Sequence, residues 1–509
     1  MKLNIDGRAI SLPELRECWQ HPVRVSLDDA VRERIAASGQ LIADVLKGGK
    51  QIYGVNTGFG QLAQTRISDE SLVSLQDNLI RSHSVGVGAL LPDDCVRLTL
   101  IMKTIALAQG YSGVRPELVD ALCELINNNI LPEIPSKGSV GASGDLAPLA
   151  HMAGALLGYG RVRVGGKSQT AEAALKRARL EPLRLAPKEG LALLNGTQVS
   201  TALAISALFR AEHILAASVT AGAMSADAIK GSDTPFDDRI QQVRGHRGQI
   251  DVAGVLRGLM QGSEIRASHI DCTRVQDPYS IRCQPQVAGA CLDVLRHVGQ
   301  LLQTEANAVT DNPLAFTDTG AVLSGGNFHA EPVALAADYL ALAIAEIGSL
   351  SERRIALLID SHLSGLPAFL VEESGLNSGF MMPQVTAAAL ASENKSLAHP
   401  ASVDSIPTSA NQEDHVSMAT FAALRLHTML DNTASIVAIE LLAAAQGIEF
   451  HHPKTSSPLL EQVIVEIRQV SERYTEDRSL SADISRLAHL VDEGYFYRFA
   501  STVLPSGAE

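Results

Sequence analysis

The sequence predicts a mainly α protein, in which a smaller, mostly helical N-terminal part precedes a long central helical bundle. Composition supports this class, because 46% of the 509 residues are hydrophobic and 4% are aromatic. Clear strand patterns are few, and three long segments after residue 195 carry apolar residues at helical spacing. We therefore expect one domain over residues 1–195 and a bundle and oligomerisation domain over residues 196–509.

The N-terminal part is expected to contain two short strand regions among its helices. Asp6-Gly7 lies between alternating segments from Leu3 to Ile10, which predicts a hairpin, and Arg161 to Val164 precedes Gly165-Gly166 in the same manner. Cap residues and apolar spacing predict three helices, over residues 68–82, 93–109 and 116–128, with Ser68 and Asp93 as N-terminal caps, Pro116 at a first position and Gly110 as a C-terminal cap.

Much longer helices are expected after residue 195. The first carries an apolar face from Val287 to Leu302, the second runs from Pro332 to about Asp360, and the third runs from Asp414 to Gln446 and is closed by Gly447. Helices that are apolar nearly all round must be covered by neighbours. We therefore expect a buried bundle whose outer faces contact other subunits.

Charge and targeting signals limit the possible partners. The net charge of −14 provides no basic surface for nucleic acid or an anionic membrane. The first residues form no signal peptide, and we expect no apolar stretch to span a bilayer, so the predicted location is the cytoplasm. The six cysteines show no paired metal-ligand spacing, which predicts reduced thiols, no disulfide and no metal site.

The most informative stretch is the glycine-rich turn Gly138-Ser-Val-Gly-Ala-Ser-Gly-Asp-Leu146, which leads into an apolar helical pattern. One interpretation is a structural left-handed turn with Asp145 as the helix cap. A second is a phosphate-binding loop at a helix N-terminus, although no Lys-Ser/Thr follows the glycines and no strand pattern precedes them.

A third interpretation is more specific. The run from Gly138 to Ala150 resembles the signature of the histidine and phenylalanine ammonia-lyases, whose Ala-Ser-Gly cyclises to a methylidene-imidazolone. Five further segments, in family order, also resemble blocks of that family: Tyr53-Gly-Val-Asn-Thr-Gly-Phe-Gly60, Asn195-Gly-Thr-Gln198, Gln276-Asp-Pro-Tyr-Ser-Ile-Arg-Cys-Gln-Pro-Gln286, Gly325-Gly-Asn-Phe-His-Ala-Glu-Pro332 and Ser409-Ala-Asn-Gln-Glu-Asp-His415. The resemblance implies a fumarase/aspartase-like helical fold and a homotetramer with shared active sites.

The resemblance also implies a self-formed cofactor. The amide nitrogen of Gly144 would attack the carbonyl carbon of Ala142, and two waters would leave, one with the hydroxyl of Ser143. Ser143 supplies the departing hydroxyl, Gly144 has free φ, and Ala142 is small enough for the turn to close. The product is an electron-poor alkene that can accept a substrate amine, so no pyridoxal phosphate is required.

Family roles are implied for four residues outside the turn. Tyr53 would be the base that removes the β-proton, although a lone loop tyrosine is usually a packing residue. Arg282 would bind the substrate carboxylate with its fork, against the alternative of a surface ion pair. Tyr279 and Gln276 would face the same cavity and support proton transfer and the electrophile.

Two further positions match family residues near the electrophile. Asn195 resembles the asparagine that donates to the imidazolone oxygen, and it could also be a helix N-cap. Phe328 matches an aromatic residue beside the electrophile, although a loop phenylalanine is commonly core. We expect His329, which follows it, to be structural.

Substrate preference depends on a few positions. Ser-His at residues 82–83 stands where tyrosine-specific relatives carry His-Leu and phenylalanine-specific ones Phe-Leu, which indicates an imidazole substrate. His83 and Glu413 would pair with its two ring nitrogens, although Glu413 could also be a helix N-terminal charge. Met381 is expected near the ligand. Ser84 and Met382-Pro383 depart from the family pattern, and Pro383 could open a helix.

The resulting hypothesis is elimination of ammonia from L-histidine to give trans-urocanate, the first step of histidine degradation. The alternatives are a phenylalanine or tyrosine ammonia-lyase, or an aminomutase that uses the same electrophile. A catalytically silent homologue and a fumarase-like lyase are further alternatives, but Ser143, Tyr53 and Arg282 are all present, and a fumarase-like lyase needs no Ala-Ser-Gly turn.

Overall fold

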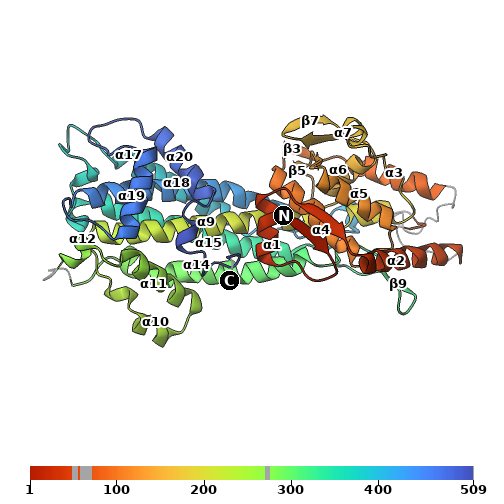
Figure 1. Ribbon diagram of the computed structural model, residues 1–509, viewed down its shortest axis with the longest axis horizontal. Coiled ribbons are helices and arrows are strands. Elements are labelled where there is room, and N and C mark those ends of the chain that lie inside the picture. Colours follow the sequence, from red (N-terminus) through yellow and green to blue (C-terminus); the bar gives the residue numbers. More distant parts are fainter. Residues whose placement is uncertain (49–54, 58–70, 270–274, 508–509) are drawn as a thin grey trace. The chain divides into compact units, whose positions relative to one another are not determined.

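The computed structural model describes residues 1–48, 55–57, 71–269 and 275–507, which are predominantly helical, as the sequence predicts (Figure 1). The chain forms two compact units. Unit 1 consists of Met1–Ser206, Gln300–Asp338 and Pro400–Leu424, and unit 2 of Ala207–Gly299, Tyr339–His399 and Arg425–Glu509. The units therefore interleave along the chain, whereas the predicted domains have a single boundary at residue 195.

Four long helices dominate the fold and contribute residues to both units. They are α9 (Gln198–Ala228), α14 (Gln284–Ala306), α15 (Glu331–Ile359) and α18 (Ala419–Glu449). The last begins five residues later than predicted, because Met418, directly before it, has positive φ and cannot continue a helix. Gly447 lies inside α18 and does not close it.

Gly447 has a packing role instead. A Cβ at this position would lie 3.0 Å from the Cβ of Ala228 in α9, so the glycine allows two helices of unit 2 to approach closely. The core of unit 2 also contains an ion pair, in which the Arg354 guanidinium contacts the Glu440 carboxylate at 2.5 Å. Ser225 and Ser351 donate to the same carboxylate, so the buried Glu440 is fully hydrogen-bonded. These contacts join α9, α15 and α18.

Three of these helices, α9, α15 and α18, are long and apolar enough to cross a membrane by length and composition alone, contrary to the expectation from the sequence. Their apolar windows are respectively 94%, 67% and 78% buried inside the structure. A continuous apolar surface of this kind is also what a central bundle helix requires.

Unit 1 is built around α4 (Asp93–Ala108), in which every residue from Cys95 to Ala108 is buried. It packs against α1 (Leu12–Gln20), α2 (Asp29–Lys47) and α5 (Pro116–Asn127). A second group places α6 (Leu146–Leu156) against α3 (Leu72–His83), α7 (Ala171–Ala178) and α8 (Glu189–Leu194). The helices predicted over 93–109 and 116–128 are thus confirmed, although the N-cap of α4 is Pro92 and not Asp93. The helix α3 confirms the described part of the helix predicted over 68–82, whose expected cap Ser68 lies outside the described residues.

The described strands form four small sheets, all in unit 1. The hairpin predicted at Asp6-Gly7 is wrong, because β1 (Lys2–Ile5) pairs in parallel with β2 (Arg24–Leu27). The chain enters α1 between them through a capping box of Ser11 and Glu14. The strand at Arg161–Val164 is confirmed as β6, paired with β7 (Lys167–Thr170). The other strands are β3 (Val87–Leu90), β4 (Leu131–Pro132), β5 (Pro135–Lys137), β8 (Leu314–Phe316) and β9 (Ala321–Leu323).

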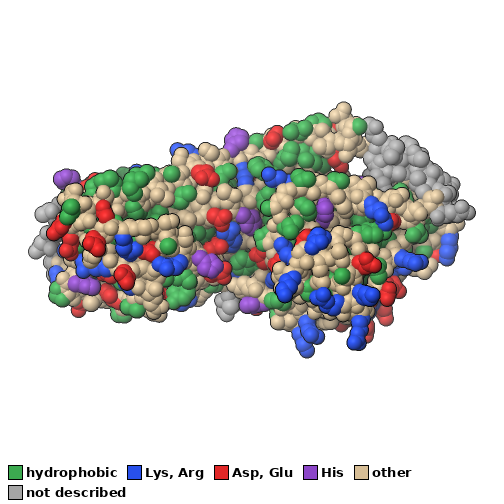
Figure 2. All heavy atoms as spheres, turned by 90° about the horizontal axis from the view of Figure 1, so that it is seen from above, with side chains coloured by type: hydrophobic (Ala, Val, Ile, Leu, Met, Phe, Trp, Pro, Cys, Tyr) green, Lys and Arg blue, Asp and Glu red, His purple; other side chains and the backbone are tan. Residues whose placement is uncertain are grey.

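On the face seen in Figure 2, acidic and basic side chains are mixed with apolar ones.

The remaining described elements are short or lie in unit 2. The elements are η3 (Thr234–Phe236), α10 (Asp238–Arg244), α11 (Arg247–Met260), α12 (Glu264–Ala267), α13 (Tyr279–Arg282), α16 (Ser361–Ser364), η4 (Ala368–Leu370), α17 (Met381–Leu397), η5 (Ser409–Asn411), α19 (Pro458–Val470), α20 (Ser481–Asp492) and η6 (Tyr497–Phe499).

Candidate active site

The glycine-rich turn lies between β5 and α6 in unit 1, and its glycines are required by geometry. Gly144 has φ +70°, and a Cβ there would lie 2.1 Å from the carbonyl oxygen of Gly196. Gly141 has φ +65°, and its Cβ would lie 2.3 Å from Oγ of Ser417. Positive φ and close backbone approach both favour glycine. The turn is therefore pressed against two other segments of the chain, with Ala142 buried and Ser143 half-buried.

Asp145 occupies the N-cap position of α6, but its side chain makes no capping hydrogen bond. The buried carboxylate instead accepts from the hydroxyls of Ser139 at 2.9 Å and Thr420 at 2.7 Å, and from both the amide and hydroxyl of Ser200. The predicted cap position is thus confirmed, but the side chain does not cap the helix. A four-donor network satisfies this buried charge and fixes the start of α6 to α9 and α18.

Asn195 holds the Ser143 carbonyl. It ends α8 as a C-cap, so the alternative of a helix N-cap does not apply. Its Nδ2 donates to the carbonyl oxygen of Ser143 at 2.8 Å, while its Oδ1 is buried and has no hydrogen-bond partner. The backbone of Asn195 is held by Lys103, a fully buried lysine whose Nζ donates to the carbonyls of Asn195 at 2.8 Å and Ala192 at 3.1 Å.

Burial gives Lys103 unusual protonation behaviour. The pKa of the Lys103 ammonium is lowered to about 7, mainly by desolvation and also by nearby Lys188, while Asp311 and Asp145 act in the opposite direction. Lys188 and Asp311 form their own buried ion pair at 2.7 Å. The amide that binds Ser143 is thus positioned by a lysine that can lose its proton near neutral pH.

Glu413 contacts the hydroxyl of the same serine. Ser143 Oγ donates to Glu413 Oε1 at 2.7 Å, and Thr408 and Ser409 donate to Oε2 at 2.6 Å and 3.0 Å. Burial raises the pKa of the Glu413 carboxyl, but these hydrogen bonds and the charge of His83 outweigh it and lower the pKa overall. Glu413 precedes α18 by six residues, so the alternative of a charge at that helix N-terminus is wrong.

His83 is the last residue of α3 and is close enough to Glu413 for an electrostatic interaction. Its Nδ1 lies 2.9 Å from the carbonyl oxygen of Leu79. A carbonyl can only accept, so Nδ1 carries the hydrogen and Nε2 is left as an acceptor. Burial lowers the pKa of His83 despite the opposing effects of Leu79 and Glu413, which favours the neutral ring.

A separate group lies in unit 2 around α13. Arg282 donates through Nη1 to Oε1 of Gln276, and its guanidinium carbon lies 5.9 Å from the ring centroid of Tyr279. The Tyr279 side chain is 75% exposed. Three predicted residues are thus brought together here. Met381, also in unit 2, is the first residue of α17, so Pro383 occupies the third position of that helix and not the first.

Phe328 and Tyr53 are the two remaining predicted site residues. Phe328 is half-buried in the loop before α15 in unit 1. Tyr53 lies outside the described residues.

Comparison with known proteins decides the family. The sequence profile described as aromatic amino acid lyase matches residues 10–469. The chain belongs to the aromatic amino acid lyase family. A histidine ammonia-lyase of Photobacterium profundum is 57% identical over 507 residues, covering 99% of both chains. A histidine ammonia-lyase of Burkholderia cenocepacia is 58% identical over 491 residues, covering 96% of this chain and 97% of the relative.

Solved structures give the same family. A histidine ammonia-lyase from Trypanosoma cruzi has a TM-score of 0.90 at 40% identity, covering 99% of this chain and 96% of that one. A tyrosine aminomutase from Streptomyces globisporus has a TM-score of 0.93 at 34% identity, covering 99% of both chains. These comparisons confirm the resemblance predicted from the motifs and the helical fold of the family.

Sequence reasoning missed several residues that support the aromatic amino acid lyase site. Lys103 carried a usable signal, because it is a charged residue within an apolar helical run. A charge buried in this way is costly unless it has a hydrogen-bonding partner. Asp145 was recognised only as a cap. Thr408 and Ser417 carried no signal, because their contacts depend on the fold of a loop distant in sequence from the turn.

Proposed function

We propose that this chain is a histidine ammonia-lyase that converts L-histidine to trans-urocanate and ammonia. The observation that carries the proposal is the double anchoring of Ser143, whose carbonyl oxygen is held by Asn195 and whose hydroxyl is held by Glu413. The names and the high identity of the relatives support the same reaction.

The proposed cofactor is a methylidene-imidazolone formed from Ala142, Ser143 and Gly144, without pyridoxal phosphate. The residues fit this group: Gly144 has no room for a Cβ, and the amide of Asn195 already donates to the oxygen that the ring would retain. Closure joins the Gly144 nitrogen to the Ala142 carbonyl carbon and releases two waters. When formed, the group supplies an electron-poor alkene for the substrate amine.

Cyclisation changes the hydrogen bonding of Glu413. The Ser143 hydroxyl leaves as water, so Oε1 loses the donor that it has in the uncyclised chain. A carboxylate with an unpaired oxygen will accept an N–H group of the substrate, while Thr408 and Ser409 still donate to Oε2. We assign His83 Nε2, which is left as an acceptor because Nδ1 is already committed to Leu79, to the other ring nitrogen of the substrate when that nitrogen carries a hydrogen.

The other assignments rest on the resemblance. Tyr53 would take the β-proton, and Arg282 would bind the substrate carboxylate with its bidentate fork. The contact of Arg282 with Gln276 and Tyr279 supports one shared site for these three side chains. Phe328 and Met381 would line the site.

We also propose a cytoplasmic homotetramer with active sites shared between subunits. Support comes from an apolar row on α15, where Leu335, Tyr339 and Leu342 are 55%, 44% and 53% exposed. Their spacing places them on one side of the helix. Light scattering after size exclusion tests the assembly, and a monomer at micromolar concentration would contradict it.

The reaction is tested by intact mass and by urocanate absorbance after addition of L-histidine, with Ser143→Ala as the control. We expect a mass two waters below the sequence mass and product only with intact Ser143. An unmodified mass without activity would refute the mechanism. L-Tyrosine and L-phenylalanine should be tested in parallel, because the tyrosine aminomutase is structurally similar; a dehydrated chain that ignores histidine but converts tyrosine would refute the assigned substrate.

A further inference from the structure

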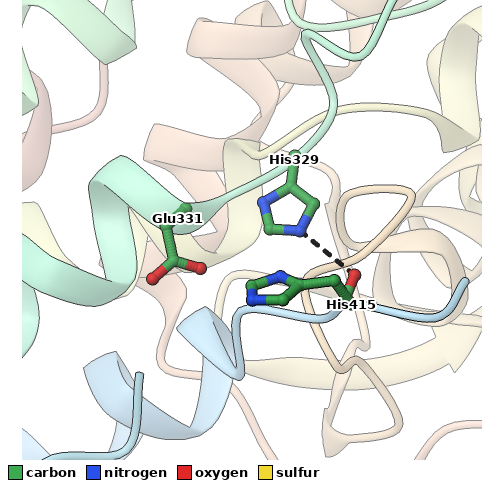
Figure 3. A group of neighbouring side chains, drawn as sticks. All are labelled: His329, Glu331 and His415. Carbon is green, nitrogen blue, oxygen red and sulfur yellow. Dashed lines mark hydrogen bonds between the residues drawn. The ribbon is translucent and has the colours of Figure 1, made fainter. Parts of the chain in front are cut away.

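Three side chains that the proposed reaction does not use meet in unit 1. His329 and Glu331 flank Ala330 at the start of α15, and His415 lies in the loop before α18. One ligand atom from each lies within 4.8 Å of the others. Figure 3 shows the two imidazole rings and the carboxylate around a common space. From these residues we propose a binding site for one Zn²⁺ or a similar divalent transition metal.

The hydrogen bonding of His329 prepares it for a metal. Its Nε2 lies 3.2 Å from the carbonyl oxygen of His415, so Nε2 must carry the hydrogen. Nδ1 then presents a lone pair, and Figure 3 shows it on the side of Glu331. Metal-binding histidines commonly donate their other N–H to a backbone carbonyl in this way, which fixes both the tautomer and the ring orientation.

The carboxylate of Glu331 also indicates a cation site. Its Oε2 is buried and has no hydrogen-bond partner. A buried carboxylate oxygen without a partner is costly, and a cation is the partner that would satisfy it.

Ligand chemistry selects the class of metal. Two imidazole nitrogens and one carboxylate oxygen suit Zn²⁺ and its neighbours more than Mg²⁺ or Ca²⁺, which prefer oxygen ligands alone. Bonds of about 2.0–2.1 Å place tetrahedral ligands roughly 3.4 Å apart, so the group must contract. His415 is exposed and can supply this movement, while three protein ligands leave a fourth position for water.

The site would act on the electrophile loop through one carbonyl. The amide of Ala330 donates to the Gly141 oxygen at 3.2 Å, and Ser417 Oγ donates to the same oxygen at 2.9 Å. Both ligand-bearing segments are thus attached to the residue before Ala142. A metal that joins His329 and Glu331 to His415 would clamp these segments and stabilise the turn.

The test is direct metal binding to the full chain after treatment with a chelator, with Zn²⁺ followed by calorimetry and Co²⁺ by visible absorption. We expect one metal per chain and the intense Co²⁺ bands of a tetrahedral site. Glu331→Gln and His415→Ala each remove one ligand, and each should weaken metal binding at least about 100-fold. Loss of a residue that only supports a ligand weakens binding by up to about that factor, and loss of the ligand itself should cost no less. His246→Ala removes an exposed histidine elsewhere and should bind like the wild type.

Several outcomes would overturn the proposal. These are no stoichiometric uptake by the wild-type chain, unchanged affinity in both ligand variants, or a thiolate-to-Co²⁺ charge-transfer band, which would assign the metal to cysteine. Glu331→Gln is isosteric, so its loss of the Zn²⁺-dependent rise in melting temperature separates a lost ligand from a misfolded chain. Ser143→Ala should still bind the metal, which makes the result independent of the proposed reaction.

Discussion

Replacing Lys103 with methionine tests whether a buried, titrating lysine positions Asn195. The pKa of Lys103 falls from 10.5 to about 7 on folding, mainly because burial penalises the ammonium. Between these pH values the unfolded chain holds more protons than the folded chain, so stability rises with pH. At pH 7 the buried lysine therefore costs roughly 4 kcal/mol relative to a neutral side chain.

Methionine removes that cost but leaves the carbonyls of Ala192 and Asn195 without their donor, a loss of about 1–3 kcal/mol each. The two effects nearly cancel at pH 7. At pH 9 about half of the cost to the wild type has disappeared, so Lys103→Met should become less stable relative to wild type by about 2 kcal/mol between pH 7 and 9. The measurement is the urea midpoint followed by circular dichroism at both pH values.

Activity provides the second readout. Releasing the Asn195 backbone should lower kcat about 10–100-fold with a small change in KM, because the amide that faces Ser143 loses its fixed position. Lys103→Arg is the matched control, since it keeps a charge that cannot be lost and should be less stable than wild type at both pH values. A stability difference between wild type and Lys103→Met that is flat from pH 7 to 9, or an unchanged kcat, would refute the reasoning.

Three other substitutions give separate tests. Asn195→Ala should lower kcat about 100–1000-fold, the usual effect of removing a donor to a developing oxyanion, and near-normal turnover would contradict its role. Glu413→Gln should raise KM for L-histidine at least about tenfold, because a neutral amide replaces the acceptor carboxylate; an unchanged KM would exclude substrate binding. Arg354→Met should destabilise unit 2 by about 3–5 kcal/mol by leaving Glu440 unpaired, and Arg354→Met with Glu440→Gln should restore much of the loss in a denaturation series.

The sequence was sufficient to predict α14, α15 and α18, because an apolar pattern sustained over many turns has few other solutions, but α9 was not among the predicted helices. It failed where a local signal had two possible outcomes. Asp6-Gly7 suits a hairpin, but β1, which precedes it, pairs in parallel with β2, which follows α1. Tertiary packing determines this pairing. Gly447 suits a helix end, but close packing against Ala228 keeps it inside α18.

The candidate site divides in the same way. Ser143, Asn195 and Glu413 could be found from the sequence because their motifs are specific, and in the structure Asn195 and Glu413 both contact Ser143. The residues that support them could not be found so easily. The link from Lys103 to Asn195 spans 92 positions in the chain, and no periodicity reports a partner at that separation.

The interleaving of the units has a consequence for the timing of biosynthesis. Unit 1 needs Pro400–Leu424 for completion, and that segment brings Glu413, Ser417 and Thr420 to the turn around Ser143. A nascent chain that has just passed residue 200 contains Ala142, Ser143 and Gly144 together with Asn195, yet nothing holds the Gly141 oxygen or the Ser143 hydroxyl. The ribosome must therefore add roughly another two hundred residues before the tripeptide has all of these contacts, so the ring closure proposed above would come late in synthesis.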